Sequence, residues 1–154
     1  MRGKKAKKRK TEKDLIYESE LVSRFVNQVM ERGKKGVAEK IMYGVLENLS
    51  QDRDEALNLL EQAVNNVQPD EEVRSRRVGG ATYQVPIPLK RDRATTLAVR
   101  WIVGSAKKKS GKPMVTLLTQ ELQAALHGEG DAMRKREQVH RTADANRAFA
   151  HFRW

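Results

Sequence analysis

Apolar side chains recur at intervals of three and four residues along most of the chain, and this spacing predicts amphipathic helices. The first helix begins at Glu20, where Ser19 is a suitable cap, and it ends before Gly33. A second helix follows from about Gly36, and a third ends before Pro69. The first half of the chain therefore predicts three helices, at about residues 20–32, 36–49 and 54–68.

The period changes from Val73 to Lys90, where apolar side chains occupy every second position of the last part of the segment. Gly79 and Gly80 supply a turn that tolerates positive φ. Pro86 and Pro88 lack N–H donors, so we expect both to face the unpaired side of an edge strand. A two-stranded hairpin is marginal alone, and it must rest on the helices at its base or on a partner at its tip.

Helical spacing resumes after the hairpin. Thr95 and Thr96 lie near the start of a fourth helix, Pro113 precedes a fifth, and Asp131 can cap a sixth that extends as far as Ala148. The predicted fold is mainly α: a six-helix bundle with one protruding β-hairpin between helices three and four.

Charge divides the 154 residues into contrasting segments, and the net charge is +11. Residues 1–13 carry +7, residues 14–72 carry −7, residues 73–112 carry +10 and residues 113–154 carry +1. Two basic segments on an otherwise acidic body are the electrostatic pattern of a nucleic-acid-binding protein.

The first basic segment, residues 1–13, has almost no apolar side chains, so we expect a disordered arm when the protein is free. Residues 14–154 then form the helical domain. The arm is interpreted as following RNA phosphates, although a solubilising or nuclear-targeting run has the same composition. Its candidate contacts are Arg2, Lys4, Lys5, Lys7, Lys8, Arg9 and Lys10.

The second basic segment includes the hairpin, where Arg74, Arg76 and Arg77 stand on one strand and Tyr83 on the other. Arginine offers a planar fork to phosphates, and tyrosine offers a ring on which a base can stack. Further basic candidates lie at the base of the hairpin, between the first two helices and at the end of the fourth: Lys90, Arg91, Arg93, Lys34, Lys35, Lys107 and Lys108.

A last cationic group lies within the sixth helix and comprises Lys135, Arg136, His140 and Arg141. These side chains either face RNA or form an ordinary solvated helix surface.

Other kinds of chemistry are poorly supported by the sequence. Cysteine is absent, which excludes disulfides and thiolate metal sites, and the three histidines lack the spacing of a zinc motif. No nucleophile–base pair can be placed, so we expect neither an enzyme nor a cofactor, and apolar runs are too short for a membrane span. Composition alone does not separate RNA from DNA: an architectural DNA-binding protein with a β-arm fits the same pattern.

Four longer sequence motifs are more specific than composition, because they point to one protein family. They are RSRRVGGATYQVP at 74–86, GKKG at 33–36, TLAVRW at 96–101 and KREQVHRTADANRAFAHFRW at 135–154. Together they closely resemble ribosomal protein seven of the small subunit (the S-seven family), in its bacterial form. The chain departs from that pattern where Thr11–Tyr17 contains no proline and where Leu89, Lys90 and Arg91 follow the hairpin.

The resemblance implies a structural protein of the small ribosomal subunit that binds rRNA directly and nucleates assembly of the head domain. It implies further partners: the exit-site tRNA, mRNA and neighbouring small-subunit proteins, with no membrane. The resemblance assigns the arm, Lys34, Lys35 and the hairpin arginines to rRNA. It places Gly79, Gly80, Tyr83 and part of the group Lys135, Arg136, His140 and Arg141 toward tRNA and mRNA. Since no targeting peptide is recognisable, we expect a cytoplasmic ribosome rather than an organellar one.

Overall fold

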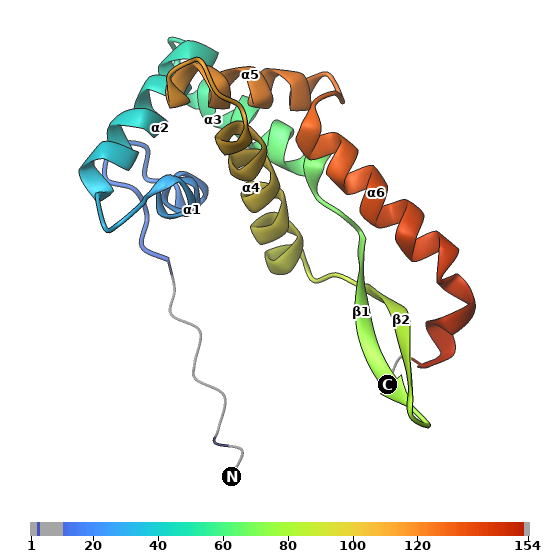
Figure 1. Ribbon diagram of the computed structural model, residues 1–154. Coiled ribbons are helices and arrows are strands. Elements are labelled where there is room, and N and C mark those ends of the chain that lie inside the picture. The colour runs from blue at the N-terminus through green and yellow to red at the C-terminus, as the bar shows by residue number, and fades with distance from the viewer. Residues whose placement is uncertain (1–2, 4–10, 153–154) are drawn as a thin grey trace.

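The computed structural model describes residue 3 and residues 11–152 of the chain. It confirms a mainly α architecture of six α-helices with a hairpin between the third and fourth (Figure 1). Most of the predicted arm, with its candidates from Arg2 to Lys10, lies outside the described residues. The elements are α1 (Glu20–Val29), α2 (Lys35–Leu49), α3 (Arg53–Val67), β1 (Glu71–Val78), β2 (Ala81–Pro88), α4 (Arg91–Lys108), α5 (Met114–Leu126), α6 (Asp131–Ala145) and the 3-10 helix η1 (Arg147–Phe152).

The core is organised around α5, which contacts α2, α3, α4 and α6. Its apolar face, including Leu118, Leu122 and Ala125, is fully buried. Burying a leucine side chain contributes about 1.5–3 kcal/mol, so this helix carries a large share of the apolar stabilisation. Charged residues of α1, α2 and α3 are exposed or partly exposed.

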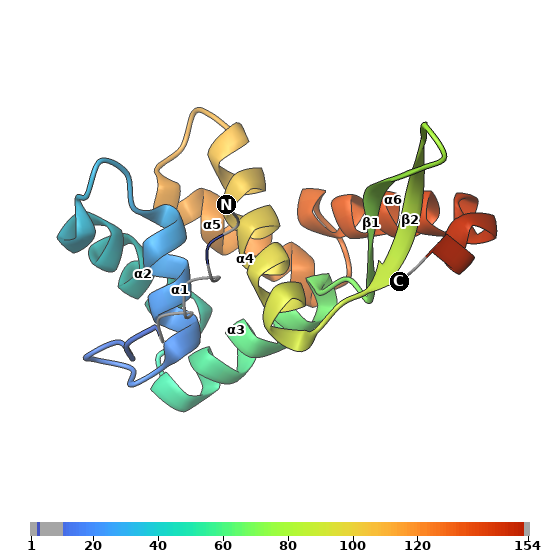
Figure 2. The ribbon, with the colours of Figure 1, turned by 90° about the horizontal axis from the view of Figure 1, so that it is seen from below.

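The hairpin lies at one end of the molecule with α6 and η1, whereas α1 and α2 lie at the other end (Figure 2). Its strands are antiparallel, with Val78 opposite Ala81 at the turn and Glu71 opposite Pro88 at the root. Gly79 and Gly80 have φ of 57° and 90°, as the predicted turn requires. The strands span 71–88, which shifts the expected segment of 73–90 by two residues toward the N-terminus.

Pro86 and Pro88 lie two residues apart on β2, opposite Val73 and Glu71, so their nitrogens point to the same side of the strand, as expected. The burial of the side chains along β2 is less regular. Pro86 and Val85 are both buried, whereas Pro88 is exposed. The strict alternation fails because the root of the hairpin is covered on more than one side, with α6 packed against β1 and β2.

The fourth helix begins at Arg91, earlier than the expected start near Thr95 and Thr96. Threonine is favoured at helix starts because its hydroxyl can bond to the backbone, and here that hydroxyl is used differently. Thr95 Oγ1 and Thr96 Oγ1 donate to the carbonyls of Arg91 and Asp92, one turn earlier in the same helix.

The ends of the sixth helix also differ from expectation. Its N-cap is Gly130, with φ of 98°, rather than Asp131. A Cβ at Gly130 would lie 3.0 Å from Glu121 Oε1, so a larger residue would displace the Glu121 side chain and would also be strained at this positive φ. The helix ends at Ala145, short of Ala148, and the chain continues as η1.

Glu121 of α5 takes the capping role that the sequence suggested for Asp131. Its side chain is fully buried, Oε1 accepts from the N–H of Ala132, at 2.9 Å, and Oε2 accepts from Lys109 Nζ, at 2.5 Å. Lys109 also lies 3.7 Å from a carboxylate oxygen of Asp131. One carboxylate therefore joins the end of α4 to the start of α6.

We expect Lys109→Met to lower the free energy of unfolding by about 3 kcal/mol, because it leaves the Glu121 carboxylate buried without its cation. Glu121→Gln should cost only about 1 kcal/mol, because the amide oxygen can still accept from Ala132 and the lysine can turn to solvent. Urea unfolding measures both. Lys108→Met, on the exposed side of α4, is the matched control and should change the value by less than about 0.5 kcal/mol. Equal losses for the first two variants would contradict this account.

Candidate nucleic-acid interface

Two predicted phosphate ligands meet at the root of the hairpin, where Glu72 binds both Arg74 and Arg93. Arg74 donates to Glu72 Oε1 through Nε, at 2.6 Å, and also forms an ion pair there through Nη2. Arg93 donates to Oε2 from Nη2 at 3.2 Å. Glu72 is buried, whereas the arginine side chains are 56% and 43% exposed. The carboxylate therefore orients two guanidinium groups without burying them.

Farther out, Arg76 and Arg77 project from opposite faces of the hairpin, because successive side chains of a strand alternate. Arg76 stands opposite Tyr83 and Arg77 stands opposite Thr82. Neither arginine is paired with a carboxylate in the described part of the chain. Their charges are therefore available to a partner on either side of the hairpin.

The predicted stacking residue Tyr83 is already in contact with aromatic side chains of η1. Its ring centroid lies 5.2 Å from that of Phe149 and 4.9 Å from that of Phe152. Tyr83 and these two phenylalanines are more than 60 residues apart in the sequence, so no local pattern indicates their contact. Tyr83 remains partly exposed, as a half-covered ring between the hairpin and η1.

The cationic group of the sixth helix divides into two faces. Lys135 and Arg141 are exposed, the latter with 82% of its side chain accessible. Arg136 and His140 are half-buried, and His140 Nε2 accepts from the N–H of Asp70 just before β1, at 3.1 Å. The structure therefore makes His140 part of the attachment of α6 to the hairpin, while Lys135 and Arg141 face outward.

Two lysine candidates that are far apart in sequence line one groove, of about 450 Å³, at the turn between α1 and α2 and the loop between α4 and α5. They are Lys34 and Lys107, with Lys112 beside them. Lys107 Nζ donates to Glu31 at 2.9 Å, and this hydrogen bond lowers the pKa of the Glu31 carboxyl. Lys35 lies one residue away and pairs with Glu39 within α2, at 3.5 Å. Lys108 points elsewhere, into a groove between α4 and α6.

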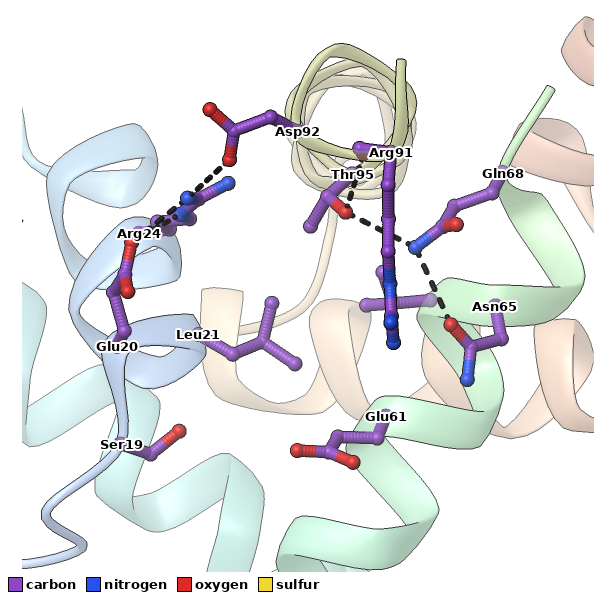
Figure 3. Close-up of a pocket in the computed structure, with 11 residues that line it drawn as sticks. Ser19, Glu20, Leu21, Arg24, Glu61, Asn65, Gln68, Arg91, Asp92 and Thr95 are labelled. Atoms are coloured by element: carbon purple, nitrogen blue, oxygen red, sulfur yellow. Dashed lines mark hydrogen bonds and ion pairs between the residues drawn. The ribbon is translucent and has the colours of Figure 1, made fainter. Parts of the chain in front are cut away.

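Lys90 and Arg91 begin α4, Lys90 as its exposed N-cap. Figure 3 shows Arg91 extending from α4 into a pocket of about 520 Å³ between α1, α3 and α4. In the same pocket Arg24 bridges Glu20 and Asp92, at 2.7 and 2.8 Å. This pocket contains side chains of both charge signs.

The residues that follow the first basic segment are held against α2 by Asp14. Asp14 Oδ2 accepts from the N–H groups of Ile16 and Tyr17, both at 3.0 Å, and Oδ1 accepts from the hydroxyl of Tyr43 at 2.8 Å. Burial and this hydrogen bond raise the pKa of Tyr43 to about 12. The path of the chain out of the basic segment is therefore fixed at Asp14.

Other sites were sought in the part of the chain that the structure describes. It contains no group of three histidine or acidic side chains able to hold a metal ion. Among its helices, none is long and apolar enough to cross a membrane.

A helical body with a projecting basic hairpin and further cationic grooves defines a protein of the nucleic-acid-binding class. Comparison with known proteins makes the assignment specific. Residues 1–147 match the family of ribosomal protein S7p/S5e. The chain belongs to this family, which confirms the resemblance found in the sequence.

Relatives named small ribosomal subunit protein uS7 cover the whole chain. The protein from Thermosipho africanus is 52% identical over 155 aligned residues, with all of both chains covered. The one from Fervidobacterium nodosum is 50% identical over the same span, and the one from Halorhodospira halophila is 46% identical over 99% of each chain.

We expect Tyr43→Phe to lower the free energy of unfolding by about 1 kcal/mol at neutral pH, since Asp14 loses a hydrogen-bond donor. The folded-state pKa of Tyr43, about 12, lies above its ordinary value of 10.0, so this stabilisation is complete below pH 10 and is lost as the pH rises through 12. The difference between the two proteins should therefore shrink over that interval in urea titrations. Tyr83→Phe removes a hydroxyl with no hydrogen bond in the described residues, and it should produce no such pH-dependent difference. A difference in the free energy of unfolding between the parent protein and Tyr43→Phe that stayed constant up to pH 12 would contradict the hydrogen bond from Tyr43 to Asp14.

Proposed function

We propose that this chain is a structural constituent of the small ribosomal subunit that binds rRNA directly. One observation carries the proposal: Arg76 and Arg77 of the hairpin have no carboxylate partner among the described residues, and they lie at the end of a body whose first helices are acidic. Family membership and relatives named as small-subunit proteins support the same assignment. The partners are the small-subunit rRNA and neighbouring proteins of the subunit, and no catalytic step is part of the role.

The mechanism follows from where the charges lie. The strands have eight residues each, which at about 3.3 Å per residue gives a projection of roughly 25 Å. Such a projection reaches between RNA helices, and phosphate contacts supply most of its affinity. The major groove of A-form RNA is too narrow for side chains to read, so specificity comes from the shape of an RNA junction.

We propose in addition that the protein nucleates assembly of the head domain. Its basic surfaces on the hairpin and at the α1–α2 turn lie at opposite ends of the fold (Figure 2), and residues 1–10 add seven basic side chains to the sequence. A rigid bundle with cations at separate places can hold RNA segments that are distant in sequence. The outward-facing residues Lys135 and Arg141, with Gly79, Gly80 and Tyr83, are then available for exit-site tRNA and mRNA, in the cytoplasmic ribosome.

We expect the double variant Arg76→Ala, Arg77→Ala to bind a head-domain rRNA fragment at least tenfold more weakly, because unpaired charges are removed from both faces of the hairpin. The slope of log affinity against log salt should fall by about 1–2, since each phosphate contact contributes about 0.7–0.9. Filter binding at several salt concentrations measures both quantities. The thermal midpoint should stay unchanged, because neither arginine has a carboxylate partner in the described residues.

Lys40→Ala with Arg53→Ala removes the same charge from the acidic body and is the matched control. Equal loss of affinity in the two double variants would contradict a specific role for the hairpin. Duplex DNA of equal charge serves as the competitor, and stronger binding to it than to the rRNA fragment would favour the architectural DNA-binding alternative.

Removal of residues 1–10 should lower the salt slope by several units, because this segment carries seven of the basic side chains. The truncation leaves Asp14 and its partners in place, so the urea midpoint should match that of the full chain. A salt slope equal to that of the intact protein would show that these residues make no phosphate contacts.

A further inference from the structure

A groove between α4 and α6 contains two of the interface candidates, Lys108 and Lys135, but has so far been given no binding role of its own. Its volume is about 450 Å³, and it lies where the end of α4 approaches the start of α6 (Figure 1). One stripe of α4 and one stripe of α6 line it, since the lining positions recur at helical spacing on both elements. They are Arg100, Trp101, Gly104, Ser105 and Lys108 of α4 and Asp131, Arg134, Lys135 and Gln138 of α6.

The wall of the groove includes Trp101. The side chain is half-buried and packs against the apolar core, and it also lines the groove. Its indole N–H makes no hydrogen bond in the described part of the chain, yet it is not a buried unpaired donor. A rigid aromatic ring, anchored by the core and open to a groove, is suited to stack on a planar group.

Gly104 keeps the groove open one turn beyond Trp101. It lies inside α4, where glycine is less favourable than alanine in a helix. A Cβ built at Gly104 would meet nothing within 4 Å, so close packing does not explain the glycine. The absence of a side chain at this position leaves space beside the indole ring.

The groove is strongly cationic. Arg100, Lys108, Arg134 and Lys135 line it, against the single carboxylate of Asp131. Asp131 is engaged by Arg134 at 2.5 Å, and Lys135 bonds to Gln138 at 3.2 Å. Arg100 and Lys108 are exposed and take part in no ion pair within the described residues. Two cations are therefore free to bind anions at the rim.

We infer that this groove binds a single unpaired nucleotide of the RNA, with its base stacked on Trp101 and its phosphates held by Arg100 and Lys108. An aromatic ring next to unpaired cations is the combination that single-stranded RNA requires. A protein segment is less suited, because a groove lined by four cations and one carboxylate selects a polyanion. The inference rests on the proposed rRNA-binding function and adds a site outside the hairpin.

The test uses a protein in which Trp101 is the sole tryptophan, through Trp154→Phe, since the chain has two. Stacking of a base on Trp101 should quench the fluorescence of this tryptophan when a head-domain rRNA fragment or hexauridylate is added. Gly104→Leu fills the groove next to the ring, and it should abolish the quenching and weaken rRNA binding about five- to tenfold. That loss corresponds to roughly 1 kcal/mol or slightly more, the lower part of the range for one stacked base.

Gln62→Leu is the matched control, because it also adds a leucine to a helix, at an exposed position of α3 away from the groove. Gln62→Leu should leave the thermal midpoint unchanged, whereas Gly104→Leu should raise it by about 2–4 °C, since a helix-favouring residue replaces glycine. The groove variant thus becomes more stable while it binds RNA more weakly, a combination that damage to the fold cannot produce.

If the rRNA fragment binds but Trp101 emission and the affinity of Gly104→Leu are unchanged, the inference is overturned and the proposed function stands. If the fragment does not bind to the parent protein, both fail. If Gly104→Leu binds rRNA normally but no longer retains a purified neighbouring small-subunit protein, the groove is a protein site and the inference is likewise overturned.

Discussion

The buried carboxylate of Glu121 is the interaction on which the arrangement of the basic surfaces depends. It binds Lys109 at the end of α4 and caps the first turn of α6 at Ala132, so it fixes the positions of two helices from the centre of a third. The direction in which α6 leaves the bundle sets where the hairpin rests and how wide the α4–α6 groove is. A fully buried ion pair is costly to form, but it permits few alternative geometries at this junction.

The helical body and the hairpin differ in charge, and the two therefore interact differently with RNA. Acidic side chains on the first three helices discourage RNA from binding nonspecifically over the body, whereas the unpaired cations lie on the hairpin and at the grooves. Where arginines are paired, as Arg74 and Arg93 are with Glu72, the carboxylate orients them and leaves much of each guanidinium exposed. The candidate RNA interface differs from the rest of the surface in the position and orientation of its cations rather than in their number.

Local sequence signals predicted the helices and the hairpin well, because the start and end of such an element depend mainly on residues that are close together in the sequence. Ser19, the Gly79–Gly80 turn and the helix stop before Pro69 are examples, and the family strings identified the family. Signals failed where a distant residue supplied the partner: Glu121 replaced Asp131 as the cap of α6, and η1 covered one side of Tyr83. The separation of Arg136 and His140 from Lys135 and Arg141 required knowing which face of α6 meets the hairpin, and Trp101 had the periodicity of an ordinary core residue.

The contact of Tyr83 with Phe149 and Phe152 has a mechanical consequence. A hairpin attached only at its root would bend like a cantilever, and its tip would sample many positions. Here the hairpin, α6 and η1 form a closed triangle, because α6 packs on the root and η1 packs on β2 farther out. Deflection of the tip must therefore strain two supports at once, so load applied there is transmitted along α6 to the centre of the bundle.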